Sequence, residues 1–214
     1  MSSGASEEKA EAGPHPEASS VEDVSNADGH QYYFYLVIHN IQKRPNVRNL
    51  LCTAAAFGCH GVFVVGQKNF NLDPKGPGIP SAIQDHVFPS ASASTSTEQQ
   101  PPRKMGMFLR HFDKWAEFVE YVQQQSIRLI GVEIHKDAKP IDHYLVRGEN
   151  NNDNSHIAFL MGNEGQGLSQ KQQDDCDGFV RIPQYGNGTA SLNVNVAANI
   201  ILQRVYQWKT STMG

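Results

Sequence analysis

The chain has 214 residues, of which 39% are hydrophobic, and its formal net charge at pH 7 is −4. This length allows one domain with a sizeable core, and no apolar run is long enough to span a bilayer, so we expect no membrane partner. Three cysteines without C-x-x-C spacing predict reduced thiols in an intracellular protein, cytoplasmic or nuclear, and argue against a disulfide-rich secreted scaffold. Nine histidines without H-E-x-x-H or similar spacing predict no metal site.

The negative charge is concentrated at the N-terminus. Residues 1–29 hold seven acids and one lysine, which leaves 15 acids against 17 bases in the rest of the chain. Because this segment has almost nothing to bury, we predict a disordered acidic tail. The body from residue 30 to 214 is mildly basic, which is compatible with RNA binding but does not require it.

The first part of the body predicts a βαβ unit. Residues 32–38, YYFYLVI, are aromatic and β-branched and predict a buried strand. A helix is expected over 47–57, ended by Gly58, and a second strand over 61–66. Strand, helix and strand in this order favour a parallel sheet.

Residues 67–105 interrupt this pattern. Pro, Gly, Ser and Thr dominate 73–78 and 90–97, which predicts a flexible surface insertion longer than compact domains usually carry. The basic side chains that follow either contact phosphate or form the solvated entrance of the next helix. They are Arg103, Lys104, Arg110, His111 and Lys114.

The remaining elements follow from apolar periodicity. Four side chains at helical spacing predict an amphipathic helix over 113–125 and belong to its core face: Trp115, Phe118, Val119 and Val122. Further strands are expected at 128–133, 157–161 and 179–183. The last helix has an apolar stripe that packs partly inside the domain and could partly face a second subunit; it consists of Val194, Ala197, Ala198, Ile201, Val205 and Trp208.

Two of these strands stop abruptly at glycine-rich loops. The run 157–161 ends at Gly162-Asn163-Glu164-Gly165-Gln166-Gly167, and the run 179–183 ends before 184–189, after which Ser191 is expected to cap the last helix. Ligands of α/β sheets bind at the carboxyl ends of strands, so we expect the functional site here. Taken singly, the glycines are ordinary turn residues, Ser191 and Asn193 are helix caps, and Glu164 faces a helix N-terminus. The full ordered set favours a site.

This order of residues resembles the SpoU (TrmH-type) branch of the SPOUT class of RNA 2′-O-ribose methyltransferases. The family carries a strand-end glycine, an Asn/Pro-Glu pair with further glycines, then Ile-Pro, then a Ser-Leu-Asn-Val helix start. Residues 162–169, 182–183 and 191–194 match these motifs, and the resemblance runs from about residue 32 to the C-terminus. It implies a mostly parallel α/β sheet flanked by helices, a C-terminal trefoil knot, and a homodimer with the site at the subunit interface.

The resemblance also implies S-adenosylmethionine as cofactor and tRNA or rRNA as substrate. Glycine turns would let backbone groups read adenine, and the lack of G-x-G-x-x-G after the first strand argues against a Rossmann-type methyltransferase. Cofactor contacts are implied for Val132, Leu160, Met161, Gly162, Asn163, Gly165, Gly167, Ile182, Pro183, Ser191 and Leu192. The residues implied to orient ribose and phosphate are Asn46, Arg48, Glu164, Ser191 and Asn193.

One motif departs from the family pattern of Asn-x-Gly with an Arg at the sixth position after the Asn. With Asn46 as the Asn, Arg48 stands in the glycine place and Cys52 in the arginine place. A thiol cannot copy a guanidinium that binds oxygen atoms, but Arg48 lies on the same predicted helix face. Either Arg48 replaces the missing arginine, or Arg48 is solvated, Cys52 is core, and the chain is a catalytically impaired RNA-binding or assembly protein that keeps the fold.

Overall fold

A computed structural model describes residues 33–67, 70, 78–87, 106–145, 156–163, 165–186 and 191–211. The predicted acidic tail, most of the predicted flexible insertion and Glu164 lie outside these residues. The predicted knot depends on the path between residues 181 and 194, which includes the undescribed residues 187–190, so the knot stays a prediction. Within the described part, no helix is both long and apolar enough to cross a membrane.

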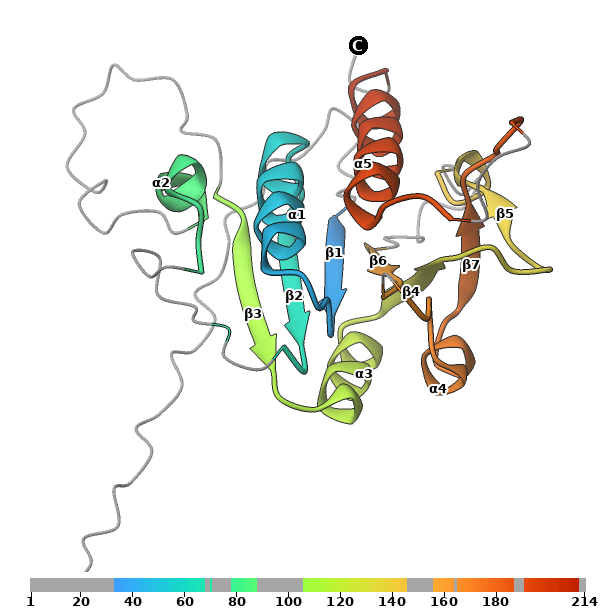
Figure 1. Ribbon diagram of the computed structural model, residues 1–214, viewed down its shortest axis with the longest axis horizontal. Helices are drawn as coiled ribbons and strands as arrows, with labels where there is room; N and C mark the ends of the chain where they lie inside the picture. The colour runs from blue at the N-terminus through green and yellow to red at the C-terminus, as the bar shows by residue number, and fades with distance from the viewer. Residues whose placement is uncertain are drawn as a thin grey trace, which may run out of the picture.

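A parallel sheet of seven strands lies at the centre of the molecule (Figure 1). The strand order is β3-β2-β1-β6-β4-β7-β5. The strands are β1 (Phe34–His39), β2 (Gly61–Val65), β3 (Phe108–Phe112), β4 (Ile127–Val132), β5 (Lys139–Pro140), β6 (His156–Met161) and β7 (Gly178–Arg181). The helices are α1 (Arg44–Ala56), α2 (Gln84–Val87), α3 (Trp115–Gln124), α4 (Gln170–Asp174) and α5 (Val194–Ser211), with 3-10 turns η1 (Ser81–Ile83) and η3 (Ile141–His143). The expected parallel α/β sheet flanked by helices is confirmed.

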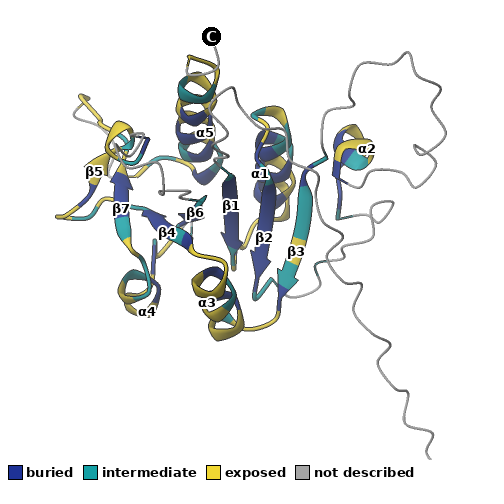
Figure 2. Ribbon diagram, turned by 180° about the vertical axis from the view of Figure 1, so that it is seen from behind, coloured by how far each residue is buried: buried dark blue, intermediate teal, exposed yellow. Residues whose placement is uncertain are grey.

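The central strands are buried on both faces, because side chains alternate between two helical layers. In β1, Leu36 and Ile38 belong to the core under α1 and α5, whereas Tyr35 and Val37 belong to the core under α3. Figure 2 shows β1 and β2 buried while α1, α3 and α5 also carry exposed surface. Double burial explains why strand β1 reads as a continuous apolar run.

Helix α1 begins earlier than predicted and ends where predicted. Pro45 in its first turn has the backbone angle that a helix start requires, so the helix begins at Arg44 and not at Val47. At the other end Gly58 has φ +66°, and the N–H groups of Gly58 and Cys59 donate to Ala55 and Ala54 carbonyl oxygens at 3.2 and 2.9 Å. This is the glycine-terminated helix end that the sequence predicts.

The basic cluster after the insertion is divided between elements. Lys114 is exposed at the N-cap of α3, as the helix-entrance alternative predicts, and Arg103 and Lys104 lie outside the described residues. Arg110 and His111 belong to strand β3 at the edge of the sheet. The Arg110 guanidinium lies 4.0 Å from the centre of the Tyr121 ring, and the His111 ring stacks on Phe70. Two polar residues in the middle of a five-residue strand hid its pattern in the sequence.

The described part of the insertion holds a short helical segment that the prediction of a flexible loop did not include. Residues 81–87 form η1 and α2, and α1 contacts η1. Ile83 and Val87 are buried in the same core as α1 and α5. These two side chains anchor the segment to the domain.

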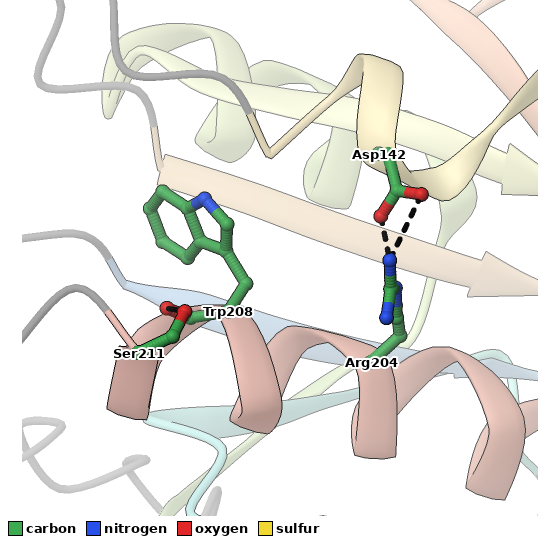
Figure 3. A network of polar contacts seen from close by, with 4 residues as sticks. All are labelled: Asp142, Arg204, Trp208 and Ser211. Atoms are coloured by element: carbon green, nitrogen blue, oxygen red, sulfur yellow. Dashed lines mark hydrogen bonds and ion pairs between the residues drawn. The ribbon is translucent and has the colours of Figure 1, made fainter.

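Helix α5 is capped by Asn193 and not by Ser191 as predicted. The Asn193 Oδ1 atom accepts the N–H of Asn195 at 2.9 Å, and the helix begins at Val194. Farther along, Arg204 donates from Nε and Nη2 to the two carboxylate oxygens of Asp142 in η3, at 2.9 and 3.1 Å (Figure 3). Both side chains are mostly exposed, so this ion pair contributes little to stability.

Candidate functional site

A cavity of about 290 Å³ lies at the carboxyl ends of three adjacent strands, β6, β4 and β7, and the start of α5 closes one side. Most residues predicted to contact a cofactor line it: Val132, Met161, Gly162, Asn163, Gly165, Gly167, Ile182, Ser191 and Leu192. Leu160 is fully buried in the core on the α3 side of the sheet, and Pro183 is exposed; neither lines the cavity.

Asn163 shapes the loop after β6. Its backbone exchanges two hydrogen bonds with Gly167, at 3.0 and 3.1 Å, which closes the loop into a tight turn. The side chain adds two more bonds: Nδ2 donates to the carbonyl of Asn40 at 2.8 Å, and Oδ1 accepts the Gly165 N–H at 3.0 Å. The loop is therefore fastened to the end of β1.

Glu133 supports this loop from the end of β4, and the sequence analysis did not identify it. Its carboxylate accepts the N–H of Leu168 at 3.0 Å and that of Ile134 at 2.9 Å. Gly167 has φ +64°, and a Cβ atom there would overlap the Glu133 carboxylate. A carboxylate at the last position of the predicted strand 128–133 was the available signal for a residue at this edge.

Asn46 joins the starts of α1 and α5. It is buried, with 8% relative exposure, and its Oδ1 accepts from Asn195 Nδ2 at 2.7 Å. The Oδ1 atom of Asn195 is also buried and has no hydrogen-bond partner among the described residues. Sequence reasoning selected Asn46 but not Asn195, which follows the matched motif 191–194.

The other predicted substrate residues have different surroundings. Arg48 is exposed one turn into α1, whereas Cys52 is half-buried and packs against the core. Ser191 lines the cavity. Asn193 is exposed and caps α5, and its Nδ2 makes no hydrogen bond to the described residues.

Helix α4 packs against the end of β1 through a polar contact. Its Gln172 is buried, completes a capping box with Ser169, and has Nε2 3.0 Å from Nδ1 of His39. Burial lowers the pKa of His39, which keeps the imidazole neutral at pH 7. These contacts hold the chain that follows the glycine loop.

The described residues contain no group of three or more His, Cys, Asp or Glu side chains arranged to hold a metal ion.

Similarity to known proteins agrees with this geometry. The sequence profile of the SpoU rRNA Methylase family matches residues 102–203. YacO of Bacillus subtilis (strain 168), assigned by name to the TrmH family of tRNA/rRNA methyltransferases, is 24% identical over 174 residues, which cover 81% of this chain and 58% of YacO. An uncharacterized tRNA/rRNA methyltransferase of Mycolicibacterium vanbaalenii is 25% identical over 82% of this chain and 47% of its own length. The chain thus spans about half the length of these relatives.

Solved structures share the fold at low sequence identity. The SpoU methyltransferase AviRb from Streptomyces viridochromogenes, in complex with the cofactor AdoMet, superposes with a TM-score of 0.60 at 22% identity, over 85% of this chain and 59% of AviRb. A structure concerning 2-OH methylation of C/U34 on tRNA superposes with a TM-score of 0.58 at 20% identity, over 84% of this chain and 98% of that one. The parallel sheet, the glycine loop at its edge and the profile match over residues 102–203 together support the SpoU (TrmH-type) family for this chain.

Proposed function

We propose that this protein transfers a methyl group from S-adenosylmethionine to a ribose 2′-hydroxyl of tRNA or rRNA. The observation that carries the proposal is the cavity at the ends of β4, β6 and β7, because residues from all three matched motifs line it. The AdoMet complex of AviRb and the relative concerned with 2-OH methylation on tRNA support this choice of cofactor and acceptor.

The cavity wall suits the two ends of S-adenosylmethionine. Apolar side chains, such as Val132, Met161 and Leu192, provide a surface for the adenine ring. Gly162 and Gly167 bring backbone close to the cavity, because a Cβ on Gly162 would lie 3.2 Å from the Gly167 Cα atom. When bound, the cofactor supplies an electrophilic methyl group on a sulfonium.

The protein's own residues must hold the ribose and make its hydroxyl nucleophilic. The paired amides of Asn46 and Asn195 fix the starts of α1 and α5 relative to each other. Basic side chains are exposed at the start of α1, at Lys43, Arg44 and Arg48, where they would contact RNA phosphates. We assign Arg48 to stabilise the developing negative charge on the ribose oxygen, and Glu164, Ser191 and Asn193 to orient the substrate.

The competing function is an RNA-binding or assembly protein that has lost turnover. It is favoured by Cys52, which packs against the core in the place where the family has an arginine. In that case the cavity would bind S-adenosylmethionine without methyl transfer.

The deciding experiment incubates the purified protein with methyl-labelled S-adenosylmethionine and total RNA, then digests the RNA to nucleosides. We expect label in 2′-O-methylated nucleosides, and calorimetry should show cofactor binding. Gly162→Val is the control, because its side chain would press on Gly167 and fill the cavity wall. Binding without label in RNA would establish the competing function, label on a base would refute the ribose acceptor, and absence of binding would refute both.

A further inference from the structure

Glu133 gives the cavity wall its charge. Among the described residues that line the cavity it is the only one with an ionisable side chain; the others are apolar, glycine, amide or hydroxyl residues. Among the described lining residues, this one carboxylate therefore supplies the charge that acts on a ligand in the cavity.

The carboxylate is held in one place. Both its oxygens accept backbone N–H groups, from Ile134 and Leu168, and the side chain fits against Gly167 where any other residue would overlap it. Each carboxylate oxygen has two lone pairs, so each retains one for a further partner. The carboxylate is therefore held in one position within the cavity wall before any ligand enters.

We propose that Glu133 is a specificity-determining residue that makes the cavity prefer a cationic donor over its neutral product. The inference rests on the proposed function. Methyl transfer removes the sulfonium charge and converts S-adenosylmethionine into S-adenosylhomocysteine, whereas the adenosine, the amino group and the carboxylate stay the same. Glu133 lines the cavity of about 290 Å³ in which the donor would bind, so its charge acts on the sulfonium with little intervening solvent. The negative charge of Glu133 stabilises the sulfonium of the bound donor, and it gives no such stabilisation to the product, which lacks this positive charge.

The test compares dissociation constants for the two ligands by calorimetry. In Glu133→Gln, which keeps the shape and removes the charge, the constant for S-adenosylmethionine should rise about tenfold more than that for S-adenosylhomocysteine. Sinefungin carries an amine in place of the sulfonium, so its dissociation constant should rise by about the same factor as that of S-adenosylmethionine. Glu120→Gln is the matched control, because Glu120 is exposed on α3 and does not line the cavity; both constants should stay at the wild-type values.

A second measurement needs no variant. In the wild-type protein, the preference for donor over product should weaken as ionic strength rises from about 0.05 to about 0.5 M, because salt screens charge attraction. Equal weakening of both ligands in Glu133→Gln, or a preference that salt leaves unchanged, would overturn the inference and leave Glu133 a support for the loop. Failure of the wild-type protein to bind either ligand would instead refute the proposed function.

Discussion

Arg48 and Cys52 lie one helical turn apart on α1 and have opposite environments. Arg48 is exposed, and Cys52 packs against the core that α1 shares with α5. A guanidinium placed one turn earlier can still reach a substrate held at the start of the helix, because long helical side chains lean toward the N-terminus. We therefore propose that Arg48 supplies the positive charge that Cys52 cannot supply.

Replacing Arg48 with alanine tests that role. We expect methyl transfer to RNA to fall about 100-fold, the loss typical of removing one donor to a developing negative charge. Affinity for S-adenosylmethionine should not change, because Arg48 does not line the cavity. Arg204→Ala is the control, since Arg204 pairs with Asp142 on the surface of α5. Undiminished transfer in Arg48→Ala would remove this residue from the mechanism.

Gly167 is a second residue at which a substitution should change stability and cofactor binding. An alanine there must adopt φ +64° and also meet the Glu133 carboxylate. We expect Gly167→Ala to lower the free energy of unfolding by about 1–3 kcal/mol, measured by urea denaturation, and to weaken cofactor binding. Gly186→Ala is the matched control, because its added Cβ atom has open space around it. Equal behaviour of the two variants would contradict the role given to Gly167.

At the site, the sequence predicted the residues that lie in contiguous motifs and missed those that join motifs. Gly162, Ile182 and Leu192, for which the family resemblance implied cofactor contacts, belong to such motifs and line the cavity. Asn195 was missed, since its contact with Asn46 joins positions 149 residues apart and has no local pattern. Glu133 was missed for the same reason, because its loop contact with Leu168 forms only when β4 and β6 are paired.

At the scale of elements, the start of α5 combines two tasks in one side chain. Asn193 caps the helix with Oδ1 and leaves Nδ2 without a partner among the described residues. A carboxylate can also cap the helix, because capping needs only an acceptor. Donating a hydrogen bond to the substrate, the role proposed for Nδ2, requires an N–H group that a carboxylate lacks.

Two substitutions separate these tasks. Asn193→Ala should lower the free energy of unfolding by about 1 kcal/mol through loss of the cap. Asn193→Asp should restore stability, and also keep the negative end of the side chain at the helix N-terminus, but should still transfer methyl groups slowly because it cannot donate to the substrate. Denaturation and methyl transfer are measured on both variants. Wild-type transfer by Asn193→Asp would reduce Asn193 to a cap.

The predictability of elements followed their length and periodicity. The helix expected over 113–125 was observed as α3 at Trp115–Gln124, since its apolar residues repeat over several turns. Strand β5 has two residues and α4 five, too few to show a period. The Ser169 and Gln172 capping box was nevertheless present in the sequence as S-x-x-Q and would have located α4.

At the scale of the whole molecule, the homodimer implied by the family resemblance has a candidate surface on α5. Val196 and Ile200 lie one turn apart on this helix and are 46% and 40% exposed. A charge introduced among apolar side chains at the centre of an interface weakens the dimer, because the charge is desolvated without a partner. Both residues lie outside the apolar stripe of α5 that packs inside the domain, on the exposed side of the helix.

Sedimentation velocity tests the dimer. We expect the wild-type protein to sediment as a dimer and Ile200→Glu as a monomer. Ala116→Glu is the control, because it adds the same charge to an exposed position on α3, across the sheet. A wild-type protein that stays monomeric at all concentrations, or an Ile200→Glu variant that still dimerises, would contradict the assignment of this surface.

The strand order has a consequence for how the protein is made. Strand β6 lies between β1 and β4, although both leave the ribosome before it. Until residue 161 has been synthesised, β6 is incomplete, and the edges of β1 and β4 that pair with it have no partner strand. Such long-range strand pairing slows folding and leaves aggregation-prone strand edges exposed. We therefore expect the nascent chain to need protection from aggregation during translation.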